Sequence, residues 1–122
     1  MPEAREIGPS STSPDGSSTW RIRRETGIEW SRDAGRTWIP QNPRVVVQLL
    51  ALDAVDATTC WIVGRSGMVL RTVDGDRWDR LVFPEAVDLA GIRAESAMSA
   101  TVTATDGRVY RTTDGGRSWS LP

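Results

Sequence analysis

Short runs of apolar or alternating residues, separated by turn-forming residues, follow one another along most of this chain. The clearest unit predicts four antiparallel strands, at Val46-Leu52, Cys60-Gly64, Met68-Thr72 and Trp78-Phe83. Three turn signals separate them: a loop of small residues at 53–59, a tight hairpin at Arg65-Ser66-Gly67, and a hairpin at Asp74-Gly75. Glycine at such corners supplies the positive φ that two-residue hairpins need.

The same pattern recurs on both sides of this unit. The following unit predicts strands at Val87-Ile92, Ala100-Ala104, Arg108-Thr112 and Ser118-Leu121. The preceding, partial unit predicts strands at Trp20-Arg24, Ile28-Trp30 and Trp38-Gln41. Seven residues between Gly67 and Arg77 are identical to those 40 positions further on. The chain therefore holds three repeats, at about 20–41, 46–83 and 87–122.

Each repeat carries one copy of a short signature: a hydroxyl residue, an aspartate, a turn glycine and a closing tryptophan. The copies are Ser31, Asp33, Gly35 and Trp38; Thr72, Asp74, Gly75 and Trp78; and Thr112, Asp114, Gly116 and Trp119. Their aspartates are 41 and 40 residues apart. We expect the carboxylate and hydroxyl to accept hydrogen bonds from the turn's own amides, and the tryptophan to be a substantially buried anchor between layers. The middle copy is one residue shorter before its tryptophan, which predicts an altered turn.

A repeat of about 40–45 residues built from short strands is typical of one propeller blade. The sequence therefore predicts an all-β fold, a partial β-propeller-like array of about two and a half four-stranded blades, with the aspartate signature at a hairpin of each. Closed propellers have about 4–8 blades, so this chain cannot close a ring alone. We expect apolar residues on its outer faces, among them some of Trp20, Ile22, Val102 and Val109, and therefore self-association or a longer native product.

The first nineteen residues have a different character. Residues 8–19 are rich in Ser, Pro and Gly and show no apolar periodicity. Such composition is typical of segments that cannot bury enough apolar surface to fold. Residues 1–19 are therefore predicted to be a disordered linker.

Charge narrows the range of partners. The 15 basic residues are all arginine, against 16 acidic residues, for a net charge of −1. This balance argues against a nucleic-acid partner or an anionic membrane surface. We interpret the cluster Arg21, Arg23 and Arg24 as a charged strand edge rather than a binding patch. The longest apolar stretch, Val45 to Leu52, is far shorter than the ~20 residues of a membrane span, and no signal peptide is recognisable, so a soluble chain is expected.

Few residues suit catalysis or cofactor binding. The chain has no histidine and no lysine, which excludes the usual triads, the commonest zinc ligand and Schiff-base chemistry. The single cysteine, Cys60, lies in an apolar strand and is predicted to be buried. Asp74, Asp76 and Asp79 lack the glycine and distal glutamate of a calcium loop. No catalytic residue, metal or cofactor is predicted.

The signature resembles the Asp-box, or BNR, repeat of sialidases and many bacterial propellers, with the consensus Ser/Thr-x-Asp-x-Gly-x-Thr/Ser-Trp. The run from Cys60 to Gly75 resembles the repeats of the photosystem II assembly and stability factors. It is also similar to a C-terminal domain of some zinc-finger, anti-sigma-like bacterial membrane proteins. The likeness covers roughly Trp20 to Pro122.

These resemblances imply a non-enzymatic protein-interaction or scaffold module that binds a protein client during photosynthetic assembly. A second form of this expectation is a sensor or docking domain of a larger bacterial membrane-associated protein, extracytoplasmic in that case. The alternative is a carbohydrate-binding or sialidase-related fragment. Sialidase sites take an arginine triad, a tyrosine nucleophile and acidic residues from several blades. The only tyrosine here, Tyr110, repeats the position of Leu70 and is predicted to be a packing residue.

Overall fold

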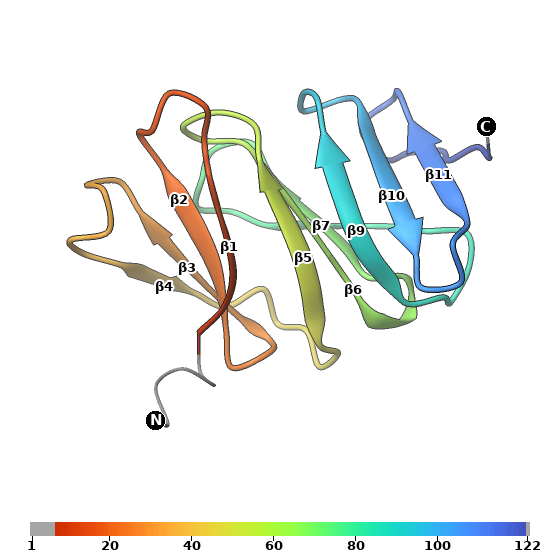
Figure 1. Cartoon of the computed structure of the whole chain (residues 1–122), viewed down its shortest axis with the longest axis horizontal. Coiled ribbons are helices and arrows are strands. Elements are labelled where there is room, and N and C mark those ends of the chain that lie inside the picture. Colours follow the sequence, from red (N-terminus) through yellow and green to blue (C-terminus); the bar gives the residue numbers. More distant parts are fainter. Residues whose placement is uncertain (1–6, 122) are drawn as a thin grey trace.

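The computed structural model describes residues 7–121 and shows three antiparallel β-sheets side by side (Figure 1). Blade 1 contains β1 (Ile7–Thr12), β2 (Thr19–Arg23), β3 (Gly27–Ser31) and β4 (Ile39–Gln41). Blade 2 contains β5 (Leu49–Ala54), β6 (Cys60–Gly64), β7 (Val69–Thr72) and β8 (Asp79–Leu81), with a short 3-10 turn, η1 (Arg65–Gly67), between β6 and β7. Blade 3 contains β9 (Leu89–Ala94), β10 (Ala100–Ala104) and β11 (Val109–Thr112), and a single bridge joins Arg111 to Ser120.

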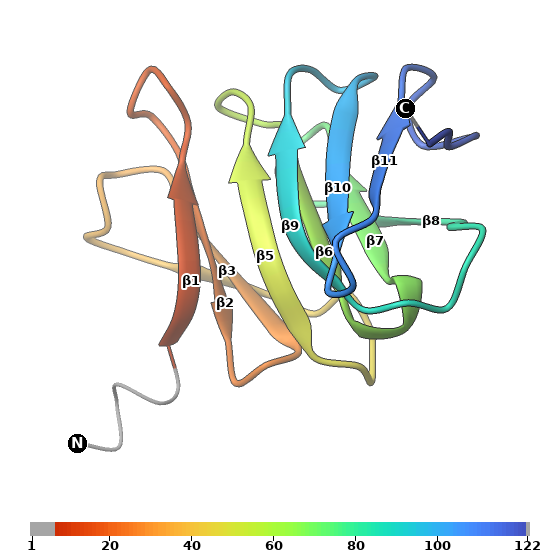
Figure 2. The same ribbon diagram turned by 45° about the vertical axis from the view of Figure 1, so that its right-hand side comes forward.

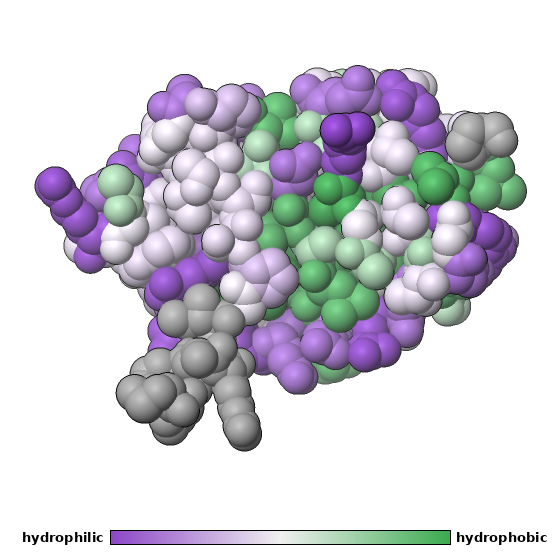
Figure 3. All heavy atoms as spheres, viewed as in Figure 1, coloured by the Kyte–Doolittle hydropathy of each residue, from purple (hydrophilic) through white to green (hydrophobic). Residues whose placement is uncertain are grey.

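The strands are arranged as in a propeller. Within each sheet the strands follow their chain order. The first strands β1, β5 and β9 lie next to one another and point the same way (Figure 2), whereas β4 (Figure 1) and β8 (Figure 2) lie at the outer rim. Apolar atoms gather over β5 and β9 on the face seen in Figure 3. The predicted all-β, partial propeller fold is confirmed.

The prediction of a disordered linker at 1–19 is wrong for residues 7–19, while the first six residues lie outside the described part. Strand β1 pairs with β2 through Ser11 opposite Trp20 and Thr12 opposite Thr19. Asp15 closes the connecting loop, where its carboxylate accepts hydrogen bonds from the hydroxyl of Ser13 and the amide of Ser17. Ladder hydrogen bonds hold β1, so the strand needs no apolar alternation. It completes blade 1 and brings the array close to three blades.

Two apolar cores lie between the blades. Core 1 joins Trp20, Ile22, Ile28 and Trp30 of blade 1 to Cys60, Ile62 and Leu70 of blade 2. Core 2 joins Trp61, Val63 and Val69 of blade 2 to Leu89, Val102 and Tyr110 of blade 3. Strand β6 is buried on both faces, because successive side chains of a strand point to opposite sides. Cys60 is buried as predicted, and this burial raises the pKa of its thiol.

Three apolar residues that were expected on the outer faces of the array are buried. Trp20, Ile22 and Val102 are 0%, 1% and 0% exposed, because they point inward to the middle blade. Alternation along β2 and β10 places Arg21 and Thr101 on the other side of the sheets, in partly exposed positions. The expectation of exposed apolar faces is therefore wrong for these three residues. Val109, the fourth residue named, is partly exposed, and self-association stays a prediction.

The arginine cluster also has a different role from the one expected. Strand β2 lies between β1 and β3, so its arginines do not form a sheet edge. Arg21 Nε and Arg23 Nη1 donate to the carboxylate of Glu29 at 2.7 and 2.9 Å. Burial raises the pKa of Glu29, but the hydrogen bonds from both guanidinium groups outweigh it and the net pKa is lowered. These residues form an ion-paired network on the outer face of blade 1.

Candidate functional site

Two of the three Asp-boxes form closely similar hydrogen-bonded turns. In box 1 the Ser31 hydroxyl accepts from the Gly35 amide at 2.8 Å, and Asp33 accepts from the amide and hydroxyl of Thr37. Box 3 repeats these contacts with Thr112, Asp114, Gly116 and Ser118. Each of these two boxes satisfies the hydroxyl and the carboxylate of its own turn locally, which is a structural role.

The middle box has a different turn. Asp74 accepts from the amides of Asp76 and Arg77 at 3.0 and 2.8 Å. Arg77 stands where the other boxes have a serine or threonine, so no hydroxyl reaches the second carboxylate oxygen from that position. Thr72 still donates to Asp74 at 3.2 Å and accepts from Gly75 at 3.0 Å. The hydroxyl accepts from an amide three residues on, whereas in boxes 1 and 3 it accepts from an amide four residues on. The shorter spacing therefore tightens the whole turn and keeps only the types of contact.

Hydroxyl donors set the acidity of the box aspartates. The Thr37 hydroxyl lowers the pKa of Asp33 to about 2, and the Ser118 hydroxyl does the same for Asp114. In the middle box the Arg77 amide lowers the pKa of Asp74. The carboxylates are therefore ionised at neutral pH and accept the turn hydrogen bonds in that form.

These pKa values predict a stability loss in acid. An unfolded aspartate has a pKa of about 3.9, so ionised Asp33 and Asp114 stabilise the fold above about pH 4, and this contribution is lost as the pH falls toward 2. Melting temperatures between neutral pH and pH 2 measure the loss. In a Thr37→Val/Ser118→Ala variant the loss in this window should be smaller than in the wild-type chain. Identical pH profiles for the two proteins would contradict this origin of acid sensitivity.

The box tryptophans are half-buried, short of the substantial burial expected of interlayer anchors. Trp38 donates to the Gly35 carbonyl at 3.1 Å, and the Arg21 guanidinium lies 3.8 Å from the centre of its ring. Trp78 donates to the side chain of Gln41 at 2.6 Å. Trp119 packs edge-on against Phe83, with ring centres 5.2 Å apart. The tryptophan at this box position therefore has a different environment in each of the three boxes.

The fully buried tryptophans lie elsewhere in the chain. Trp20 and Trp61 are both 0% exposed, and Trp20 stacks in parallel on Trp30 with ring centres 5.7 Å apart. None of the three belongs to a box. Trp20 and Trp30 alternate with charged residues in their strands, and Trp61 lies in an apolar strand. These patterns are the signal that could have identified them as the main anchors of the core.

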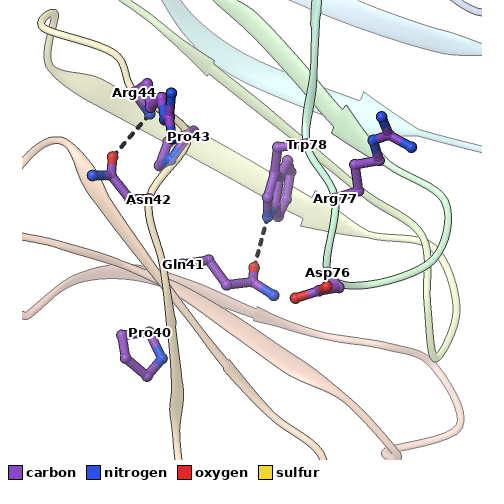
Figure 4. A pocket seen from close by; sticks show the side chains of 8 residues that line it. All are labelled: Pro40, Gln41, Asn42, Pro43, Arg44, Asp76, Arg77 and Trp78. Carbon is purple, nitrogen blue, oxygen red and sulfur yellow. Dashed lines mark hydrogen bonds between the residues drawn. The ribbon is translucent and has the colours of Figure 1, made fainter.

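A groove of about 650 Å³ lies at the rim between blades 1 and 2 (Figure 4). It is lined by Pro40, Gln41, Asn42, Pro43 and Arg44 on one side and by Asp76, Arg77 and Trp78 on the other. The chain leaving β4 forms the first wall, and the altered second half of box 2 forms the second. A neighbouring hollow of about 530 Å³ shares Pro40 to Asn42 and extends to Arg23 and Glu29.

Gln41 links the two walls at the base of this groove. Its side-chain oxygen accepts from the indole N–H of Trp78 at 2.6 Å, and its amide nitrogen donates to the Gly75 carbonyl at 2.7 Å. Both polar ends of the side chain are thereby satisfied although it is only 9% exposed. The Trp78 ring is held in one orientation by a hydrogen bond from the opposite blade.

The first wall is conformationally restricted. Pro40 and Pro43 each have a fixed φ, and the Arg44 amide donates to the Asn42 side chain at 2.9 Å. Sequence reasoning singled out Trp78 but missed Gln41 and the 42–44 turn. The available signal was that Gln41 is polar where the next repeat has the apolar Leu81.

Tyr110 lies in a second cluster, away from the groove. Its hydroxyl donates to Glu85 at 2.5 Å, and Arg108 Nη1 donates to the same carboxylate oxygen at 2.7 Å. The hydrogen bond to Glu85 raises the pKa of Tyr110. The ring is 3% exposed and packs edge-on against Phe83.

Within residues 7–121, no group of three or more Cys, Asp or Glu side chains is arranged to hold a metal ion. The same residues contain no helix with the length and apolarity needed to cross a membrane.

The fold and the repeated boxes define a partial Asp-box propeller. The family described as Photosynthesis system II assembly factor YCF48 matches residues 12–121, and the chain belongs to this family. A curated relative is the chloroplastic photosystem II stability/assembly factor HCF136 of Arabidopsis thaliana. It is 29% identical over 107 residues, which cover 79% of this chain and 26% of the relative.

Solved structures share the fold. A structure of YCF48 bound to D1 peptide has a TM-score of 0.83 at 24% identity and covers 99% of this chain and 40% of that one. YCF48 from Cyanidioschyzon merolae has a TM-score of 0.82 at 21% identity, over 99% and 41%. A GH74 xyloglucanase from Xanthomonas campestris has a TM-score of 0.56 at 15% identity, over 94% and 24%. The chain thus spans about a quarter of the curated relative and two fifths of the YCF48 chains. The likeness to anti-sigma-like proteins stays a prediction.

Proposed function

We propose that this chain is a non-catalytic protein-binding module that holds an extended segment of a client protein during assembly of a photosystem-type membrane complex. Membership of the assembly-factor family supports the class of function. The fold is that of a YCF48 structure with a bound D1 peptide, which supports a peptide segment as the ligand. A place within a larger membrane-associated protein is part of the same proposal.

The groove between blades 1 and 2 is the observation that carries this proposal. It offers the half-buried ring of Trp78, and aromatic residues in pockets are the usual anchors of protein recognition. Gln41 and the two prolines hold its walls before any ligand arrives, and preorganised sites lose less entropy on binding.

The environment of Tyr110 favours packing over catalysis. A tyrosine nucleophile must give up its proton, whereas the hydrogen bond to Glu85 raises the pKa of this phenol. The ring is also enclosed by Phe83. Both features support the non-catalytic part of the proposal. The likeness to a xyloglucanase concerns the fold.

Fluorescence anisotropy of a labelled D1 peptide tests the function. We expect a saturable rise when the protein is titrated into the peptide, and a much weaker response with a scrambled peptide of the same composition. A flat titration at protein concentrations approaching millimolar, or equal responses to the two peptides, would count against a client-binding role.

A further inference from the structure

The two blade junctions are built from equivalent positions, so one can serve as a template for the other. Gln41 faces Ile28 across the β3–β4 ladder as Leu81 faces Val69 across the β7–β8 ladder. The equivalent pairs, each 40 or 41 residues apart, are Gln41 and Leu81, Pro43 and Phe83, and Trp78 and Trp119. The side chains at these positions differ between the junctions, and the shape of the rim differs with them.

Apolar side chains close the junction between blades 2 and 3. The Phe83 ring lies 5.2 Å from the ring of Trp119 at an interplanar angle of 62°, and 4.9 Å from that of Tyr110. Leu81 lies against Gly116. A Cβ added to Gly116 would lie 2.6 Å from a methyl carbon of Leu81. An aromatic ring thus packs edge-on against the box tryptophan.

The junction between blades 1 and 2 is open at the same positions. Gln41 replaces the leucine and uses both ends of its amide on Trp78 and the Gly75 carbonyl. Pro43 replaces the phenylalanine, and it lines the groove opposite Trp78 (Figure 4). Trp78 packs on core 1, but within residues 7–121 no aromatic ring forms a stacked or edge-on pair with it as Phe83 does with Trp119. The groove therefore offers Trp78 to an aromatic ring from outside the chain.

The charges on the groove walls also favour one kind of partner segment. Arg44 and Arg77 are exposed on opposite walls, the Arg77 side chain extending away from Trp78, and the acidic side chain of Asp76 lies beside Gln41 (Figure 4). Neither guanidinium forms an ion pair with another part of the described chain. The local surplus is one positive charge, and complementary charge favours a partner with carboxylates beside its anchor.

We infer that this groove binds a partner segment carrying an aromatic side chain flanked by aspartate or glutamate. The ring packs edge-on against Trp78, as Phe83 packs against Trp119, and the carboxylates face Arg44 and Arg77. This specificity rests on the proposed function, because it names the chemistry of the segment that the same groove would hold.

The first test fills the groove with larger apolar side chains of the protein itself. The variant Gln41→Leu/Pro43→Phe gives the first junction the side chains of the second. We expect it to stay folded and to lose at least tenfold in affinity for the D1 peptide. Val46→Phe is the control, because Val46 is 95% exposed and outside the groove, and it should bind normally. Unchanged binding by the folded double variant would overturn the inference.

The second test uses three capped tetrapeptides, Asp-Phe-Asp-Gly, Asp-Ala-Asp-Gly and Lys-Phe-Lys-Gly, at millimolar concentration. The indole N–H resonance of Trp78, assigned with Trp78→Phe, is followed by NMR. We expect a saturable shift with the acidic phenylalanine peptide and little shift with the other two. Equal shifts with the alanine or lysine peptide, or a larger shift at Trp38, would contradict the inference. A selective tetrapeptide shift without D1 peptide binding would uphold the anchor chemistry and reject the D1-type client.

Discussion

Trp61→Ala is expected to lower the free energy of unfolding by about 4 kcal/mol, within the range for large-to-small changes of buried aromatic residues. Trp61 is 0% exposed at the centre of core 2. Its indole N–H donates to the Ser96 carbonyl at 3.0 Å, and its ring lies edge-on to Trp119. The substitution removes contacts on both sides of the junction between blades 2 and 3.

Urea unfolding measures this loss, and Trp38→Ala is the matched control. Trp38 is half-buried at the free face of blade 1, so we expect its loss to stay near 1 kcal/mol, as for sites away from the core. Similar losses for the two variants would mean that the blades do not depend on the core between them.

Gly75→Ala should lower the free energy of unfolding by about 3 kcal/mol. Two separate causes contribute to this loss. Gly75 has a φ of +83°, a left-handed conformation that costs an alanine about 1–2 kcal/mol. An added Cβ would also lie 2.3 Å from the ring of Trp30. Trp30 must then shift within core 1, and overpacking of this kind costs about 1–3 kcal/mol.

Gly107→Ala separates the two causes. Gly107 has a φ of +91°, but an added Cβ would have no atom within 4 Å. We expect this variant to lose about 1–2 kcal/mol in urea unfolding, from the backbone alone. Equal losses at positions 75 and 107 would show that Trp30 does not pack against the second box as described.

Local and repeated features could be predicted from the sequence. The three Asp-boxes, the hairpin glycines and the 40-residue period identify blades and most strands, because turn chemistry acts over a few residues. Cys60 was placed correctly for the same reason, since it lies in an uninterrupted apolar strand. The family resemblance followed from the same residues and is confirmed by the match to residues 12–121.

Features that depend on long-range packing could not be predicted from the sequence in the same way. Strand β1 has no apolar alternation, because ladder hydrogen bonds to β2 hold it at the inner edge. The burial of Ile22 and the exposure of its neighbours depend on which face of blade 1 meets blade 2. The groove arises because Gln41 and Pro43 do not fill the space that Leu81 and Phe83 fill in the next junction. The sequence shows these four residues, but their consequence appears only when the blades are stacked.

D1 peptide anisotropy on two box variants, Trp78→Ala and Trp38→Ala, tests whether a client binds in the groove between blades 1 and 2. Both remove a half-buried tryptophan at the same repeat position, and thermal unfolding should first show that each variant is folded at the titration temperature. We expect at least tenfold weaker binding for Trp78→Ala and wild-type binding for Trp38→Ala. Wild-type binding by folded Trp78→Ala, or equal losses in both variants, would contradict a client site in the groove between blades 1 and 2.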